Sequence, residues 1–229
     1  MLTLQIQGTE ETISLQPSRL FIAGFTGRDR AWIDAHMEEL QAHGIPTPTR
    51  VPLMFPLTPE LLTTSDRFHV LGDQTSGEAE FVIIQHHGRI YLAAGSDHTD
   101  RSLERTSIPY SKQICPKVIS RQIWPLDAVG GRLHQIELRG IAGARTGYQV
   151  GTLGEMLAPE EIQGIMLERF GGSLEGAVIF SGTPAISDEG GFAFGEPFTA
   201  QLTDLASGAV LRCSYEVVVT PLVDPLAAD

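Results

Sequence analysis

The sequence predicts an α+β protein in which a mixed, strongly curved β-roll carries two or three peripheral helices. Glycine occurs 24 times and proline 14 times among the 229 residues. So many chain-breaking residues favour many short strands and turns over long helices. Two segments do have the three- and four-residue apolar spacing of an amphipathic helix, one beginning at Asp29 and the other at Pro159.

The N-terminal elements follow from the residue pattern. Thr3–Ile6 and Thr12–Leu15 alternate polar and apolar residues on either side of a turn, which predicts a hairpin. Arg19–Gly24 is apolar and short, as expected of a buried strand. The helix that begins at Asp29 ends before Gly44, and its apolar stripe consists of Trp32, Ile33, His36, Met37 and Leu40.

The middle of the chain begins with an extended, proline-rich path that holds a short helical turn at Pro59–Leu62. Residues 69–95 read as a hairpin, and residues 112–145 contain further short strands. No internal repeat is present.

In the C-terminal part, Pro159–Phe170 reads as a helix that a proline opens and two glycines end. Ala177–Phe180 and Cys213–Val219 are apolar enough to be central strands, and the residues after Pro221 are expected to form a loose tail.

Composition excludes several classes of partner. The net charge is −12 and only 19% of residues are charged, with no cluster of lysine or arginine, so we expect neither nucleic acid nor a membrane surface as partner. Cys115 and Cys213 lie far apart without a disulfide or zinc motif. The N-terminus lacks the pattern of a signal peptide, and no apolar run approaches the roughly 20 residues that span a bilayer. The expected location is the bacterial cytoplasm.

Three carboxylates carry the main functional hypothesis. Glu78 and Glu80 are two apart on a predicted strand, so they project from the same side. The next strand, Gly88–Ala94, returns antiparallel and brings Asp97 beside them. Adjacent carboxylates repel unless a cation lies between them, and oxygen ligands suit Mg²⁺, Mn²⁺ or Ca²⁺. The alternative is a solvated hairpin with an acidic outer face.

At these residues the chain resembles the fumarylacetoacetate hydrolase superfamily. Members carry a Glu-x-Glu strand and a later Asn-Asp-x-Ser-Ala-Arg-Asp run whose first Asp completes a metal site. Here the second run spans residues 96–102, in which Asp97 and Arg101 match while Asn, Ala and the last Asp do not. The order of further motifs is also similar from Phe21 to Leu202, namely at Ser111-Lys112, Tyr148–Thr152, Glu155–Leu157, Leu174–Pro184 and Gly195–Leu202.

The resemblance implies a metal held by Glu78, Glu80 and Asp97, and a homodimer formed through one face of the roll. One departure is that relatives insert a helix between the two carboxylate strands, whereas sixteen residues separate Glu80 from Asp97 here. The chain therefore resembles a shortened bacterial branch of the superfamily.

His36 and Glu39 are the candidate catalytic residues. They are three apart on the first predicted helix, so the carboxylate can orient the imidazole as a base. The superfamily members that cleave or decarboxylate 2-oxo acids carry a His-x-x-Glu on a mobile helix that closes over the metal, and His36 to Glu39 has that spacing. The alternative is that His36 belongs to the buried stripe of the helix.

Four residues are candidates for binding a substrate carboxylate: Arg101, Lys112, Gly182 and Thr183. Basic residues are scarce in this acidic chain, so Arg101 and Lys112 stand out near the carboxylates. Gly182 and Thr183 end a buried strand, where backbone N–H groups and a hydroxyl are available. The alternatives are a structural ion pair and an ordinary turn.

The leading hypothesis is a divalent-metal-dependent hydrolase or lyase that acts on a small 2-oxo acid or 1,3-dicarbonyl carboxylate through an enolate-like species. We expect one domain over residues 1–229, with the N-terminal hairpin and lid helix in 1–50 and the metal-binding β-roll in 51–229. A second hypothesis is a non-catalytic metabolite-binding or subunit-interaction module with a structural metal. A third is a zinc amidohydrolase that uses His86, His87 or His98, although these lack the usual ligand spacing.

Overall fold

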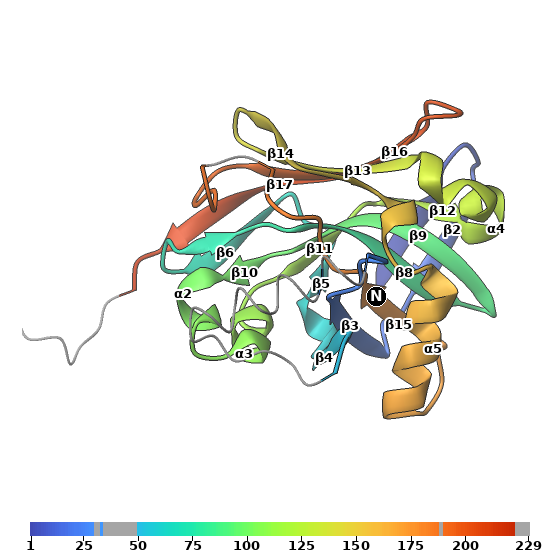
Figure 1. The fold of residues 1–229 in the computed structure, drawn as a ribbon, viewed down its shortest axis with the longest axis horizontal. Coiled ribbons are helices and arrows are strands. Elements are labelled where there is room, and N and C mark those ends of the chain that lie inside the picture. The colour runs from blue at the N-terminus through green and yellow to red at the C-terminus, as the bar shows by residue number, and fades with distance from the viewer. Residues whose placement is uncertain (30–32, 34–49, 188–189, 223–229) are drawn as a thin grey trace, which may run out of the picture.

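The computed structural model describes residues 1–29, Ile33, 50–187 and 190–222, and its strands form two main β-sheets (Figure 1). The larger sheet has the strand order β2-β1-β12-β9-β8-β15-β3-β4, with β11 pairing to both β9 and β5. Parallel and antiparallel pairs are mixed, as predicted. Its strands are β1 (Leu2–Ile6), β2 (Thr12–Leu15), β3 (Arg19–Gly24), β4 (Leu53–Leu57), β5 (Leu62–Thr63), β8 (Ala79–His86), β9 (Arg89–Asp97), β11 (Lys117–Ile119), β12 (Gln122–Pro125) and β15 (Ala177–Phe180).

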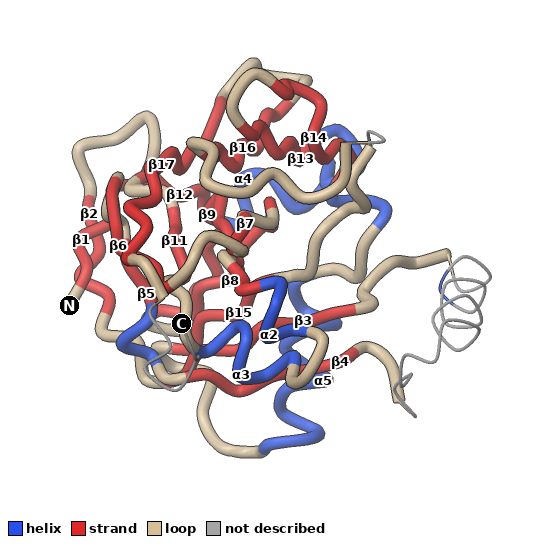
Figure 2. Tube along the Cα trace, turned by 90° about the vertical axis from the view of Figure 1, so that its left-hand side faces the viewer, coloured by secondary structure: helices blue, strands red, loops and turns tan. Residues whose placement is uncertain are grey.

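The smaller sheet lies over the outer face of the larger one (Figures 1 and 2). Its five strands follow the order β14-β13-β16-β17-β6, and a separate two-stranded pair joins β7 to β10. These strands are β6 (Arg67–Leu71), β7 (Thr75–Ser76), β10 (Thr99–Asp100), β13 (Ile136–Ala142), β14 (Arg145–Thr152), β16 (Phe198–Asp204) and β17 (Val210–Thr220).

The larger sheet curls around its own core, which makes it a roll. One cluster of buried apolar side chains takes all its members from strands of this sheet, for example Leu4, Leu20, Ile84 and Phe180. A second cluster fills the space between the roll and the smaller sheet and includes Phe81. The predicted curved β-roll is therefore confirmed.

Strands β8 and β9 are buried on both faces because they separate the two cores. Alternate residues of β8 enter the interior of the roll, as Val82 does, or the core between the sheets, as Phe81 does. This explains the run of seven buried residues in β8. The alternation of side chains along β8 and β9 also decides where the site lies. It places Glu78, Glu80 and Asp97 on the face that lines the interior of the roll.

Four α-helices lie in the described residues: α2 (Arg101–Glu104), α3 (Ile108–Gln113), α4 (Leu126–Val129) and α5 (Pro159–Phe170). Three 3₁₀ turns accompany them, namely η1 (Pro59–Leu61), η2 (Gly130–Gln135) and η3 (Leu153–Glu155). The helix predicted at Pro159 is confirmed as α5, and it ends at Gly171, whose φ of +57° suits glycine. The sequence analysis did not predict α2, α3 or α4, since a helix of four to six residues is too short to show a period.

The remaining predictions have different outcomes. The structure confirms the N-terminal hairpin, the strand Arg19–Gly24 and the hairpin of β8 and β9. Cys115 and Cys213 are buried and free. The predicted helix from Asp29 falls, apart from Asp29 and Ile33, outside the described residues. No helix in the described parts of the chain is long and apolar enough to cross a bilayer.

Gly95 of β9 tests the packing of the roll. An added Cβ would lie 2.4 Å from Cγ2 of Val82 and 2.9 Å from Cε1 of Phe180. We expect Gly95→Ala to lower the free energy of unfolding by about 1–3 kcal/mol in a denaturant titration. The control is Gly147→Ala on β14, where a Cβ meets nothing within 4 Å. Equal stability of both variants would contradict the packing described for β8 and β9.

Candidate metal centre

The three predicted carboxylates converge where β8 begins and β9 ends, at the end of the hairpin away from its turn. The Asp97 amide donates to the Glu78 carbonyl at 3.0 Å, and Glu80 pairs with Gly95 across the two strands. One carboxylate oxygen from each of Glu78, Glu80 and Asp97 lies within 4.8 Å of the others. The strand alternation in the sequence predicted this convergence correctly.

Asp97 is fully buried between two lysines. Lys112 Nζ donates to its Oδ2 at 2.5 Å, and Lys117 Nζ lies 2.9 Å from its Oδ1. Burial alone would raise the pKa of Asp97, but the two ammonium groups outweigh it and lower that pKa to about 2. Lys117 reaches Asp97 because β11 pairs with β9 and places these two residues opposite each other. Asp97 is therefore ionised at neutral pH.

Glu78 also has cationic neighbours. Arg101 Nη2 lies 3.1 Å from its Oε1, and Lys112 Nζ lies 3.1 Å from its Oε2. Burial would raise the pKa of Glu78, but the charges of Arg101 and Lys112 leave it lowered. Arg101 also pairs with Glu104 at 2.9 Å and donates to Ser76. Its geometry is that of a structural ion pair, and it is not among the residues that line the adjoining cavity.

Glu80 is the least compensated of the three. It is 1% exposed and accepts the Gly182 N–H at 2.8 Å. No lysine or arginine of the described residues lies within ion-pair distance of it. Burial and the neighbouring charges of Asp97 and Glu78 raise the pKa of Glu80 well above its ordinary value. Of the three carboxylates, Glu80 is therefore the one whose ionised form the described residues stabilise least.

The cluster fits a hard divalent ion on two counts. Its three donors are all carboxylate oxygens, which Mg²⁺ and Mn²⁺ prefer. It also lacks a cation beside Glu80, whose ionised form is disfavoured by burial and by the neighbouring carboxylates. The Lys112 ammonium already contacts Glu78 and Asp97, so a bound ion must share both carboxylates with Lys112.

A cavity of about 930 Å³ opens next to the cluster. Glu78, Glu80 and Lys112 line it, together with Gly182 and Thr183. Elsewhere its wall is largely apolar and includes Phe25, Leu53, Phe55, Ile108, Val150, Met156, Ile186 and Phe192.

The turn at Gly182 and Thr183 is fixed against β8. Thr183 Oγ1 donates to the Ala79 carbonyl at 2.9 Å and accepts from Gln149 Nε2 at 2.5 Å. Gln149 Oε1 in turn accepts the Ala79 N–H at 2.9 Å. The Gly182 N–H is engaged by Glu80, so the glycine amide holds a carboxylate of the cluster, and the proton of the Thr183 hydroxyl is engaged by the Ala79 carbonyl.

The histidines differ in environment. The two ring nitrogens of His98 each lie 2.9 Å from a hydroxyl, of Tyr215 and of Thr75. Burial, helped by the charge of Lys117, lowers the pKa of His98 to about 3, so its ring is neutral and structural. His36 and Glu39 lie outside the described residues.

The sequence analysis missed two residues. Lys117 was not singled out, although a lysine inside the apolar strand Lys117–Ile119 is a signal for a buried ion pair. Gln149 was noted only as part of a motif, and its role in fixing the turn depends on contacts with Ala79 and Thr183, which are 70 and 34 residues away in the sequence and which no local pattern reveals.

The family model described as "Protein of unknown function (DUF2848)" matches residues 23–215. The chain belongs to this family. No curated protein matches this DUF2848 chain.

Solved structures show the same fold at low sequence identity. One, described as a fumarylacetoacetate isomerase/hydrolase from Oleispira antarctica, is 18% identical, with a TM-score of 0.66 over 95% of this chain and 100% of that one. A second, described as a fumarylpyruvate hydrolase from Burkholderia cenocepacia, is 18% identical, with a TM-score of 0.64 over 96% of each chain.

A third structure is 2-keto-3-deoxy-D-arabinonate dehydratase complexed with magnesium and 2,5-dioxopentanoate. It is 14% identical, with a TM-score of 0.65 over 90% of this chain and 74% of that one. The DUF2848 chain therefore has the fold of the fumarylacetoacetate hydrolase superfamily, and the resemblance inferred from its motifs is confirmed at the level of the fold.

Asp97→Asn tests the buried ion pairs. The substitution leaves Lys117 buried without its counter-charge, so we expect a loss of about 3–5 kcal/mol in the free energy of unfolding, measured by denaturant titration without added metal. The control is Asp127→Asn, which breaks the exposed pair with Arg89 and should cost less than about 1 kcal/mol. Comparable losses in the two variants would show that Asp97 does not compensate Lys117.

Proposed function

We propose that this protein is a divalent-metal-dependent hydrolase or lyase that acts on a small 2-oxo acid or 1,3-dicarbonyl carboxylate through an enolate-like species. The observation that carries the proposal is the convergence of Glu78, Glu80 and Asp97 beside a large cavity, with no compensating cation next to Glu80 among the described residues. The fold agrees with it, since the similar structures are described as a hydrolase, an isomerase/hydrolase and a dehydratase.

The proposed ion is Mg²⁺ or Mn²⁺, held by Glu78, Glu80 and Asp97. When bound, it would polarise two adjacent oxygens of the substrate and stabilise negative charge on them. The similar dehydratase structure contains magnesium together with a dioxo acid. The magnesium belongs to the dehydratase structure, and for this chain it supports the choice of ion.

Residues of the chain supply the remaining roles. Lys112 presents an ammonium at the cluster end of the cavity, and burial lowers its pKa less than Asp97 and Glu78 raise it, so it stays charged and can bind the substrate carboxylate. Thr183 also lines the cavity, and its hydroxyl would donate to a second carboxylate oxygen once it releases the Ala79 carbonyl. His36, oriented by Glu39, would move the proton.

The cavity wall indicates which part of the substrate lies away from the cluster. Lys112 is the one basic residue among the described residues that line it, whereas Asp29, Glu104 and Glu155 add negative charge. The apolar part of the wall favours an uncharged hydrocarbon group, and a second substrate carboxylate would be repelled. Acylpyruvates with uncharged acyl groups are therefore better candidates than dicarboxylates.

A second candidate function is a non-catalytic metabolite-binding or subunit-interaction module with a structural metal. The pairing of Asp97 and Glu78 with Lys112, Lys117 and Arg101 favours it, because a cluster that is largely neutralised needs no reaction to explain it. The two candidates differ in turnover. A homodimer, which the superfamily resemblance implies, is compatible with both.

Metal binding and turnover test the proposal together. Mg²⁺ or Mn²⁺ should raise the melting temperature of the chelator-treated protein, since an ion bound only by the native state must stabilise it. Glu80→Gln should abolish the shift, whereas Glu104→Gln, which changes an acid of the same cavity outside the cluster, should retain it. Hydrolysis of acylpyruvates should require the ion and exceed that of short oxo-diacids. A shift without turnover on any oxo acid would support the binding module, and no shift would contradict both candidates.

His36 has a separate test. If it moves the proton, His36→Ala should lower kcat by about 10²–10⁴-fold with little change in KM, as measured by steady-state kinetics on the best acylpyruvate. Glu39→Gln should lower kcat by a smaller factor, and Glu38→Gln, one residue away, should leave it unchanged. Full turnover by His36→Ala would remove the pair from the mechanism and leave the metal proposal standing.

A further inference from the structure

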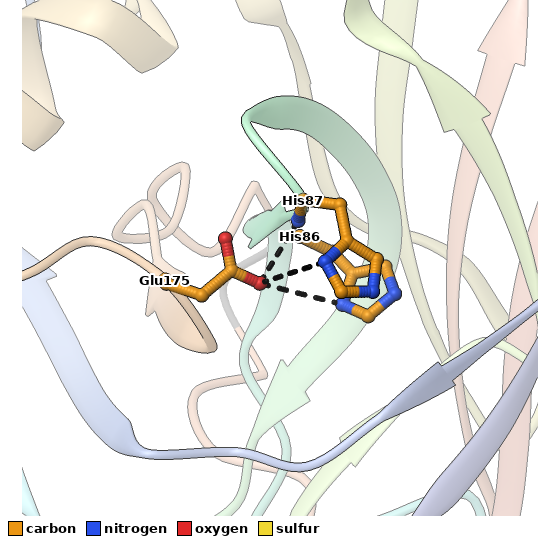
Figure 3. A group of neighbouring side chains, drawn as sticks. All are labelled: His86, His87 and Glu175. Atoms are coloured by element: carbon orange, nitrogen blue, oxygen red, sulfur yellow. Dashed lines mark hydrogen bonds and ion pairs between the residues drawn. The ribbon is translucent and has the colours of Figure 1, made fainter.

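Another group of candidate ligands lies at the opposite end of β8 and takes no part in the proposed function. His86 ends β8, His87 follows in the turn to β9, and Glu175 precedes β15 (Figure 3). One ligand atom from each lies within 4.8 Å of the others. His86 is six residues from Glu80 along an extended strand, which is about 20 Å. The group is therefore separate from the carboxylate cluster.

The backbone brings the two imidazoles together. Neighbouring residues of a strand project to opposite faces, so adjacent histidines normally diverge. His87 instead has a φ of +50°, a left-handed conformation that is uncommon outside glycine. The ring centroids of His86 and His87 are consequently only 4.0 Å apart. Glu175 Oε1 accepts the His87 N–H at 2.9 Å and so holds the turn in this form.

The ligand atoms have nearly the spacing of a metal site. His86 Nδ1 lies 3.6 Å and His87 Nδ1 lies 3.9 Å from Glu175 Oε1. Figure 3 shows both rings turning a nitrogen toward this one oxygen. Tetrahedral ligands at zinc bond lengths of about 2.1 Å are about 3.4 Å from one another, so small side-chain rotations complete the geometry. Within the described residues neither ring forms a hydrogen bond, and Glu175 is the nearest charged partner of both.

We propose that His86, His87 and Glu175 bind Zn²⁺, or another first-row transition ion that prefers imidazole nitrogen. Two nitrogens and one carboxylate oxygen form a borderline-soft ligand set, unlike the oxygen-only cluster at the other end of β8. The His87 side chain is 84% exposed and that of Glu175 50% exposed, so water completes the coordination and the ion exchanges with solution. The site joins residues 88 positions apart, so the bound ion ties the β8–β9 turn to the segment that leads into β15.

Calorimetric titration of the chelator-treated full chain with ZnCl₂ tests this site. Saturating Mg²⁺ is kept present so that Zn²⁺ does not report on the carboxylate cluster. His86→Ala, His87→Asn and Glu175→Gln should each weaken the tightest Zn²⁺ event by about tenfold or more. Asn tolerates the backbone of His87, and Gln can still accept the His87 N–H, so these two variants keep the turn.

The controls separate this site from others. His69→Ala and His134→Ala remove exposed histidines elsewhere and should leave Zn²⁺ affinity unchanged, as should Glu80→Gln. Equal Zn²⁺ binding by the three site variants and wild type, or equal weakening by His69→Ala, would overturn the proposal. The result does not depend on turnover, so the proposed function and this site can fail separately.

Discussion

The placing of three carboxylates side by side, with Glu80 and Asp97 buried and Glu78 half-buried, is the constraint on which the site depends. Glu78, Glu80 and Asp97 continue the row of residues that faces the interior of the roll, so strand alternation places them at the end of an apolar core. Like charges in such a place are costly unless compensated. The surrounding structure supplies that compensation from three directions: Lys112 from α3, Arg101 from α2 and Lys117 from β11.

The cationic side chains do not compensate the three carboxylates equally, and the least compensated one is where we propose that the ion binds. Asp97 and Glu78 each have two cationic neighbours, whereas Glu80 has the single N–H of Gly182. A site with every acid neutralised would be purely structural. Glu80 lies next to the cavity and lacks a cationic neighbour among the described residues. A divalent ion bound there would supply the missing positive charge. The lysines hold the acids together, and Lys112 is also placed to meet a substrate anion.

The sequence predicted those parts of the structure that depend on local pattern. The period of two in β8 and β9 predicted both the hairpin and the convergence of Glu78, Glu80 and Asp97. Motif order predicted the superfamily fold although sequence identity to similar structures is below 20%. What it missed depends on tertiary pairing: Lys117 lies beside Asp97 only because β11 joins β9, and the Gly182 amide is engaged only because β15 lies next to β8.

The most direct test of the account is crystallographic. Crystals of the full chain grown with saturating Mn²⁺ and measured near the manganese absorption edge should show an anomalous peak bounded by the carboxylates of Glu78, Glu80 and Asp97, with Lys112 still contacting Asp97. The account would be contradicted by the absence of such a peak, with the Lys112 ammonium bridging Glu78 and Asp97 and no ion beside Glu80.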